Sequence, residues 1–230
     1  MQGVLLVDKP ADWTSFDVVN YVRRIVATRE EKKPKNCKVG HTGTLDPFAT
    51  GLLVLLVGKE YTRKAETLTK LDKTYEVTMK LGFSSSTGDP EGEITPAPGI
   101  EPSIEALQAA VQKFTGPILQ VPPAYSAIKV NGQRAYKLAR EGKEVVIAAR
   151  PVTINTLEIA SYAYPNVKLV TNVSSGTYIR TLVEDIAAAA GTMAYCTELR
   201  RTTVGEFSVS DALGVKTLTA DLLELSLASS

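Results

Sequence analysis

The sequence is poor in the residues that cross-link small proteins or bind metals in them. Its 230 residues include two cysteines, one histidine and one tryptophan. Cys37 and Cys196 stand far apart and form no CxxC pair, so neither a disulfide framework nor a zinc site is expected. No apolar run approaches the roughly 18 residues of a membrane-spanning helix. Residues 3–7 are too short an apolar run for a signal peptide, so we expect a cytoplasmic protein.

An excess of charge of one sign is also missing, because 26 Lys and Arg face 25 Asp and Glu. This balance is unlike the strongly basic domains typical of nucleic-acid binding. The charges are unevenly spread, however. Residues 121–150 hold six Lys or Arg against two Glu, residues 23–38 are also basic, and residues 81–120 hold one Lys against five acids. A neutral protein with two separated basic segments can still present one positive face, although each run alone is typical of a solvated surface.

Strand and helix patterns alternate without a regular β-α-β rhythm, which favours an α+β fold over a doubly wound sheet. A hydrophobic content of 44% is ample for a core. The expected strands are 3–8, 37–39, 52–57, 73–81, 151–162, 166–174 and shorter pieces up to about 210. The expected helices are 14–27, 59–68, 103–114, 133–140, 177–190 and at most one over 218–227. Residues 82–100 are predicted to be a long mobile loop, and residues 130–133 a tight hairpin.

The most informative segment is residues 40–52, GHTGTLDPFATGL, which places His41 five residues before Asp46. Asp46 followed by Pro47 is by itself typical of a helix start. Here an apolar run at 52–57 follows, which suits a strand buried on both faces. A carboxylate on a tight turn beside such a strand is rigidly aimed, as reacting groups usually are.

Three further clusters hold candidate functional residues. In residues 174–182, SSGTYIRTL, Tyr178 and Arg180 are expected in the first turn of a helix. An arginine gains nothing from the positive end of a helix dipole, so either it is a surface residue or an aspartate elsewhere pairs with it. Tyr75 lies on the alternating strand 73–81, where core packing is the ordinary role. Residues 121–140 interleave tyrosines with basic residues, as in surfaces that bind RNA.

In their order along the chain, these clusters resemble the motifs of the TruB family of tRNA pseudouridine synthases. The resemblance runs from about residue 3 to 212. It includes the segments DKP to WTS at 8–15, DKTY at 72–75, SGTYIR at 175–180 and LRR at 199–201, besides residues 40–52 and 121–140. It implies an isomerase that converts the uridine at position 55, in the T loop of tRNA, into pseudouridine. The nucleotide would be flipped out, and its glycosidic bond would be broken and re-formed with Asp46 acting as nucleophile at C1′ or as base at C2′.

The resemblance also implies roles for other residues. His41 would occupy the space vacated in the T loop, and Tyr75 would stack on the flipped base. Arg180 would pair with Asp46, while Tyr178 and Leu199 would line the pocket. Lys129, Arg134 and Arg140 would contact phosphates.

The implied fold is the pseudouridine synthase catalytic fold, a mixed and largely antiparallel sheet flanked by helices and loops. We expect a single catalytic domain over residues 1–230, with a thumb-like RNA-binding insertion at about 121–150. A monomer that acts on the T stem-loop without metal, cofactor, guide RNA or membrane is implied. The family usually adds a small C-terminal RNA-binding domain, often of PUA type, for which residues up to 230 leave no room. We therefore expect weaker tRNA affinity with intact catalysis.

Two other interpretations stay open. An idle tRNA-folding chaperone is disfavoured as the sole role by the presence of Asp46, Tyr75 and Arg180. A nucleoside hydrolase that uses Asp46 at a ribose carbon is disfavoured by the basic segment 121–140, and the release of free uracil would reveal it.

Overall fold

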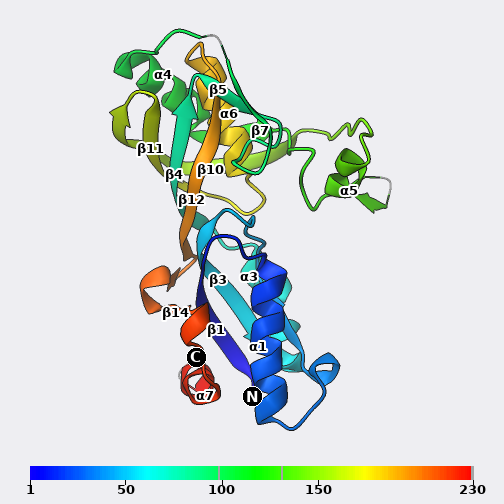
Figure 1. The fold of residues 1–230 in the computed structure, drawn as a ribbon. Coiled ribbons are helices and arrows are strands. Elements are labelled where there is room, and N and C mark those ends of the chain that lie inside the picture. Colours follow the sequence, from blue (N-terminus) through cyan, green and yellow to red (C-terminus); the bar gives the residue numbers. More distant parts are fainter. Residues whose placement is uncertain (98, 131, 229–230) are drawn as a thin grey trace. The chain divides into compact units, whose positions relative to one another are not determined.

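The computed structural model describes residues 1–97, 99–130 and 132–228. The chain forms two compact units, of which unit 1 comprises Met1–Tyr75 with Leu199–Ser230 and unit 2 comprises Glu76–Glu198. Two strands, β4 (Lys73–Leu81) and β12 (Ala194–Val204), each begin in one unit and end in the other (Figure 1). Within the described residues, no helix combines the length and the apolar character needed to cross a membrane.

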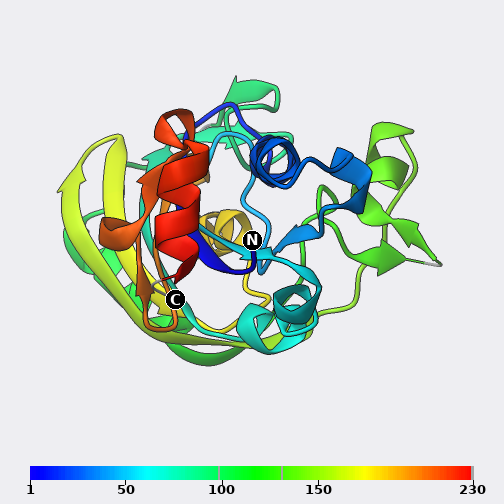
Figure 2. The same cartoon turned by 90° about the horizontal axis from the view of Figure 1, so that it is seen from below.

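Unit 1 is built on strands in the order β14-β1-β3-β12, with β2 also paired to β3 and β13 to β12. Strand β1 is antiparallel to β3 and parallel to β14, and β3 is parallel to β12. Both ends of the chain lie in this unit, where α7 packs against β1 (Figure 2). Besides β4 and β12, the elements are β1 (Gly3–Lys9), α1 (Ser15–Arg29), η1 (Pro34–Asn36), β2 (Val39–His41), β3 (Thr50–Val57), α2 (Lys59–Thr62), α3 (Ala65–Thr69), β13 (Phe207–Ser208), η2 (Val209–Asp211), β14 (Leu213–Gly214), η3 (Val215–Thr217) and α7 (Ala220–Ala228).

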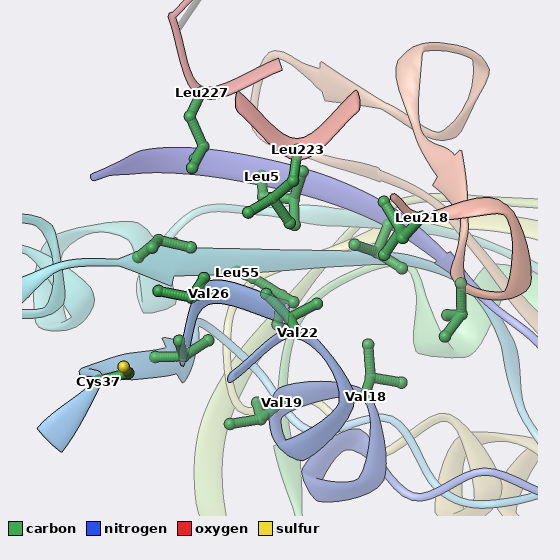
Figure 3. Packing of buried hydrophobic residues seen from close by; sticks show 14 of the residues in the cluster. Leu5, Val18, Val19, Val22, Val26, Cys37, Leu55, Leu218, Leu223 and Leu227 are labelled. Carbon is green, nitrogen blue, oxygen red and sulfur yellow. The ribbon is translucent and has the colours of Figure 1, made fainter. Parts of the chain in front are cut away.

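Strand β3 is buried on both faces, as its apolar run predicts. One face joins a cluster formed by α1, β1 and α7, in which the valines of α1 meet Leu5, Leu55 and Leu223 (Figure 3). On the other face, Leu52 and Val54 pack with Val204. Helix α1, expected from residue 14, begins with a capping box: Thr14 Oγ1 accepts from Asp17 N, and the Asp17 carboxylate accepts from Thr14 N.

Unit 2 contains strands in the order β4-β11-β10-β7, and β10 is antiparallel to both of its neighbours. Helix α4 packs against α6 and β10. Between β7 and β10, residues 121–130 and 132–149 project away from the sheet strands of the unit (Figure 1). The further elements are β5 (Phe83–Ser85), β6 (Ile94–Pro96), α4 (Ile104–Phe114), β7 (Gly116–Gln120), β8 (Lys129–Val130), β9 (Gln133–Arg134), α5 (Ala135–Arg140), β10 (Arg150–Ala163), β11 (Asn166–Val173) and α6 (Ile179–Ala189).

The α+β class and the mixed, mostly antiparallel pairing are confirmed. Three predictions of local structure are wrong. Residues 82–100 are not one loop, because β5 and β6 pair as a hairpin. The helix predicted at 59–68 is split into α2 and α3, since Thr62 Oγ1 bonds back to Gly58 O and Lys59 O at the break. The strand predicted at 37–39 begins only at Val39, because Cys37 N closes the η1 turn on Pro34 O.

Strands β8 and β9 pair as the predicted hairpin. Asn131 of that hairpin and Pro98 of the predicted loop lie outside the described residues. The shorter strands predicted beyond residue 190 are mainly one long strand, β12. Helix α6 begins at Ile179 rather than at Thr177, because Tyr178 has an extended backbone with φ −101° and ψ 109°. Tyr178 is therefore the N-cap residue and not part of the first turn.

Candidate active site

Asp46 lies in the loop of residues 42–49 that connects β2 to β3. No helix begins at the Asp46-Pro47 pair: Ala49 N donates to Asp46 O at 3.2 Å, and β3 starts at the next residue. The helix-start interpretation is therefore wrong, whereas the turn beside a strand buried on both faces is confirmed. Asp46 itself is half-buried.

Two side chains near the N-terminus hold the backbone on both sides of Asp46. The Ser15 hydroxyl accepts from Leu45 N at 2.8 Å and donates to Leu45 O at 3.1 Å. Lys9, which is fully buried, donates from Nζ to Pro47 O at 3.0 Å. Because a buried ammonium group requires such acceptors, these contacts give the motif at residues 8–15 a structural role that its sequence did not reveal.

Arg201 of β12 holds the start of the same loop. Its guanidinium donates from Nε to Leu52 O at 2.7 Å and from Nη2 to Gly43 O at 3.1 Å, and the residue is 2% exposed. Lys73 lies against Gly43 as well, since a Cβ on that glycine would be 3.4 Å from Lys73 Cε. Burial and the nearby Arg201 charge lower the pKa of Lys73 to about 8. The loop is thus surrounded by buried cations that bind backbone oxygens.

His41 is the last residue of β2 and is half-buried. Gly43 N donates to His41 Nδ1 at 3.3 Å, so Nδ1 is unprotonated and the neutral ring carries its proton on Nε2. Burial, together with the charge of Arg201, lowers the pKa of His41 below its usual value. The imidazole is therefore neutral at pH 7, and its place in the T loop stays a prediction.

Tyr75 and Leu199 are buried in unit 1, each 7% exposed. Along β4, Tyr75 alternates with exposed or half-buried residues and shares a face with Val77, Met79 and Leu81, as predicted. The burial agrees with the ordinary core role of Tyr75, and its stacking role stays a prediction.

In unit 2, Arg180 is 4% exposed and so is not the surface arginine that the sequence also allowed. Its Nη1 lies 3.0 Å from Asp89 Oδ2 and donates to Thr87 O at 2.7 Å, while Nη2 donates to Tyr125 O at 2.9 Å. The sequence predicts an aspartate partner but does not identify Asp89, because the composition of residues 82–100 is typical of a mobile loop. The pairing of Arg180 with Asp46 stays a prediction.

The side chain of Asp89 is itself held in place by hydrogen bonds within the β5–β6 hairpin. Its Oδ1 accepts from Thr87 Oγ1 at 2.5 Å and from Glu91 N at 3.0 Å. These bonds close a local turn typical of aspartate, and the side chain is buried. The hairpin therefore presents a pre-set carboxylate to the start of α6.

The segment of residues 121–150, here called the basic segment, exposes the three predicted phosphate contacts. Lys129 and Arg134 are register partners across the β8–β9 hairpin, and both are exposed, as is Arg140 on α5. Arg134 Nη1 donates to Ala127 O, and the Arg140 guanidinium lies 5.7 Å from the Tyr136 ring centre. Among the described residues, no group of three or more His, Cys, Asp or Glu side chains is placed to hold a metal ion.

Two family models match the chain. TruB family pseudouridylate synthase (N-terminal domain) matches residues 29–179, and tRNA pseudouridylate synthase B C-terminal domain matches residues 180–226. Two curated relatives, both named tRNA pseudouridine synthase B, are 44% identical to this chain. The protein of Paenarthrobacter aurescens aligns over 100% of this chain and 74% of its own length. That of Thermobifida fusca aligns over 98% of this chain and 77% of its own length.

Solved structures agree on the fold. A chain in the crystal structure of a Cbf5–Nop10–Gar1 complex is 27% identical, with a TM-score of 0.71, and matches 97% of this chain and 55% of its own length. A chain in the crystal structure of an archaeal box H/ACA sRNP Nop10–Cbf5 complex is 25% identical, with a TM-score of 0.66. It matches 97% of this chain and 53% of its own length. The present chain thus spans about half the length of those chains. From the family models and the curated relatives, the chain belongs to the TruB family of pseudouridylate synthases and is a tRNA pseudouridine synthase, an isomerase.

Proposed function

We propose that this enzyme isomerises the uridine at position 55, in the T loop of tRNA, with Asp46 acting at the ribose. The observation that carries the proposal is the fixed geometry around Asp46, whose neighbours Leu45 and Pro47 are bonded to Ser15 and Lys9. A carboxylate on such a braced turn is positioned before substrate arrives, which is how a reacting group contributes most to rate.

The reaction is a rearrangement within one nucleotide. The N1–C1′ bond breaks, the uracil rotates, and a C5–C1′ bond forms, while C5 loses a proton and N1 gains one. Asp46 acts either as the nucleophile at C1′ or as the base that removes the C2′ proton. Both routes need an ionised carboxylate, which nearby positive charge favours.

The other site residues bind the nucleotide and the loop from which it leaves. Flipping the uridine costs a few kcal/mol, and stacking on an aromatic ring returns about 1–3 kcal/mol per base. Tyr75 provides that ring. The neutral imidazole of His41 fills the space left in the T loop, and Tyr178 and Leu199 line the pocket. Arg180, held by Asp89, pairs with Asp46 and keeps it ionised and oriented.

The basic segment holds the T stem. Lys129, Arg134 and Arg140 are exposed cations on a hairpin and the helix that follows it, and they contact phosphates. The enzyme acts as a monomer on this stem-loop and needs no metal, cofactor or guide RNA.

The test maps pseudouridine by carbodiimide modification and primer extension on an unmodified tRNA transcript, with wild type beside Asp46→Asn. We expect one stop, at the T-loop uridine, with wild type and none with Asp46→Asn, although both bind tRNA. The same reaction on a T-arm stem-loop with EDTA tests whether protein and RNA suffice.

Each contrary result has a distinct meaning. Turnover by Asp46→Asn near the wild-type level would refute the role of Asp46. Release of free uracil would identify a hydrolase. Binding of tRNA without a stop for either protein would instead indicate an RNA-binding or chaperone role.

A further inference from the structure

Gln120, the last residue of β7, binds the backbone of Tyr178 at both of its polar groups. Its Nε2 donates to Tyr178 O at 3.0 Å, and its Oε1 accepts from Tyr178 N at 2.8 Å. The side chain is 2% exposed. A carboxamide has one donor face and one acceptor face, so it reproduces the pair of bonds that a neighbouring strand would make.

These two hydrogen bonds are made at the N-terminal end of α6. Tyr178 is the N-cap of α6, and its side chain makes no capping hydrogen bond. A glutamine from another element binds the N–H and the C=O of that residue, and the same C=O also accepts from Leu182 N at 3.1 Å. Arg180 stands two residues further along the helix, and its guanidinium donates to Tyr125 O.

The same two contacts also fix the entry to the basic segment. The chain leaves β7 at Gln120 and passes Tyr125 before it reaches the β8–β9 hairpin. Both residues are bonded to the N-terminal end of α6, Gln120 through the backbone of the N-cap residue Tyr178 and Tyr125 through Arg180. The placement of Tyr178 and Arg180 relative to the base of the basic segment therefore depends on these two contacts.

We propose that Gln120 is a positioning residue, whose amide sets the placement of Tyr178 and Arg180 relative to the base of the basic segment. The inference rests on the proposed roles of Tyr178 and Arg180. It assigns Gln120 no contact with substrate, because both polar atoms of its side chain already bind the Tyr178 backbone.

The main test is Gln120→Glu, which keeps the shape but changes the hydrogen-bonding pattern. An ionised glutamate accepts from Tyr178 N but cannot donate to Tyr178 O, whereas a protonated one does both. Burial disfavours the ionised form. Arg150 is its register partner on β10, and Arg180 lies two residues along α6 from Tyr178, and the positive charge of both favours the ionised form. Rates relative to wild type are therefore recorded from about pH 8 down to about pH 5.5.

We expect the single-turnover rate of Gln120→Glu to fall about tenfold or more at about pH 8, since one buried hydrogen bond is lost. It should return to within about threefold of wild type at about pH 5.5. The tRNA dissociation constant should stay within about twofold throughout, because a positioning role affects the rate and not the binding. Gln112→Glu, on the exposed side of α4, is the matched control and should follow wild type at every pH.

Gln120→Met keeps the chain length, introduces no charge, and keeps the inference testable if Gln120→Glu folds poorly. It should lose the same tenfold or so at every pH. A rate for Gln120→Met within about threefold of wild type would overturn the inference, as would a pH profile of Gln120→Glu parallel to that of wild type. Asp46→Asn is assayed alongside, so that turnover by that variant identifies a failure of the proposed function rather than of the Gln120 inference.

Discussion

At the scale of single residues, the loop that carries Asp46 is organised by cations that bind carbonyl oxygens. Lys9 and Arg201 are almost completely buried, and their hydrogen bonds go to the backbone of residues 10, 13, 43, 47 and 52. Such charge-assisted bonds are about twice as strong as neutral ones. The positive charge of Arg201 also lowers the pKa values of His41 and Lys73, so its effect on the loop can be measured by titration.

His41 offers the simplest such measurement, because it is the only histidine and its ring signals need no assignment. Burial and the Arg201 charge lower its pKa, so a titration followed by NMR should have its midpoint below the ordinary histidine value. Arg201→Met removes one of these causes and should raise the midpoint. An unchanged or lower midpoint in that variant would contradict the charge coupling.

The lowered pKa of His41 also determines how the free energy of unfolding changes with pH. Because the folded state holds its proton on His41 less tightly than the unfolded chain does, stability should be lost as the pH falls below the unfolded value of about 6.5. The loss of free energy of unfolding is complete once the pH lies below the folded pKa. His41→Asn should flatten this part of the stability curve, measured by denaturant unfolding at several pH values.

The Asp89–Arg180 pair gives a second residue-scale prediction. Both side chains are 5% exposed, so Asp89→Asn removes a buried counter-charge from the guanidinium. We expect a loss of about 3–5 kcal/mol in the free energy of unfolding. The control is Glu66→Gln, which breaks the exposed pair with Lys70 and should cost under about 1 kcal/mol. Equal losses in the two variants would show that burial does not decide the energetics.

At the scale of elements, the contact between β3 and β12 depends on a residue without a side chain. Gly51 has φ +101°, and a Cβ there would lie 2.3 Å from Arg201 O and 2.7 Å from Arg201 N. The two strands pair at this point, with Gly51 opposite Arg201. The strand after the Asp46 loop can therefore approach the strand that bears Arg201 only if residue 51 is glycine.

Gly51→Ala should accordingly destabilise the protein by more than the strain of its φ angle, which costs about 1–3 kcal/mol. Gly116→Ala is a matched control, because Gly116 has φ +98° but a Cβ there would have no neighbour within 4 Å. Thermal and denaturant unfolding of both variants would isolate the steric part. A similar loss for the two would mean that the strands separate at little cost.

The elements that the sequence predicted well are those with strong local signals. The capping box at Thr14, the alternation along β4 and the apolar run of β3 depend on neighbouring residues only. The β5–β6 hairpin escaped prediction, because its Gly, Ser and acidic residues are typical of loops. Asp89 is buried there through a partner 91 residues away. A contact so distant in sequence leaves no periodic pattern.

The same limit applies to the site. His41 and Asp46 were found because one contiguous motif contains both, and Arg180 because its place at a helix start needed a partner. Gln120 carries no motif of its own, and its function depends on the backbone of a residue 58 positions later. The bracing role of Arg201 likewise follows from contacts with Gly43 and Leu52 that only the folded chain brings together.

At the scale of the whole molecule, the net charge of +1 conceals a concentration of positive charge in the basic segment. Each phosphate contact made by such a cation releases counterions, so affinity should fall steeply with salt. Binding by this enzyme should therefore depend on where its charge lies rather than on its total.

Replacing Lys129, Arg134 and Arg140 together by glutamine should weaken tRNA binding. It should also reduce the slope of log affinity against log salt by about 2–3, which is close to one per contact. A control that replaces the exposed Lys113, Lys168 and Lys216 removes the same charge elsewhere and should leave the slope nearly unchanged. Equal changes in both triple variants would assign the effect to net charge alone.

The course of the chain through the two units has a consequence for biosynthesis. Unit 2 is one continuous stretch, Glu76–Glu198, whereas unit 1 needs residues both before and after that stretch. As the nascent chain leaves the ribosome, unit 2 can therefore complete its structure first, although its residues are made later than those of the Asp46 loop. Arg201, which binds the carbonyl oxygens of Gly43 and Leu52, emerges only after the whole of unit 2. The Asp46 loop thus acquires its final support only after unit 2 has been synthesised.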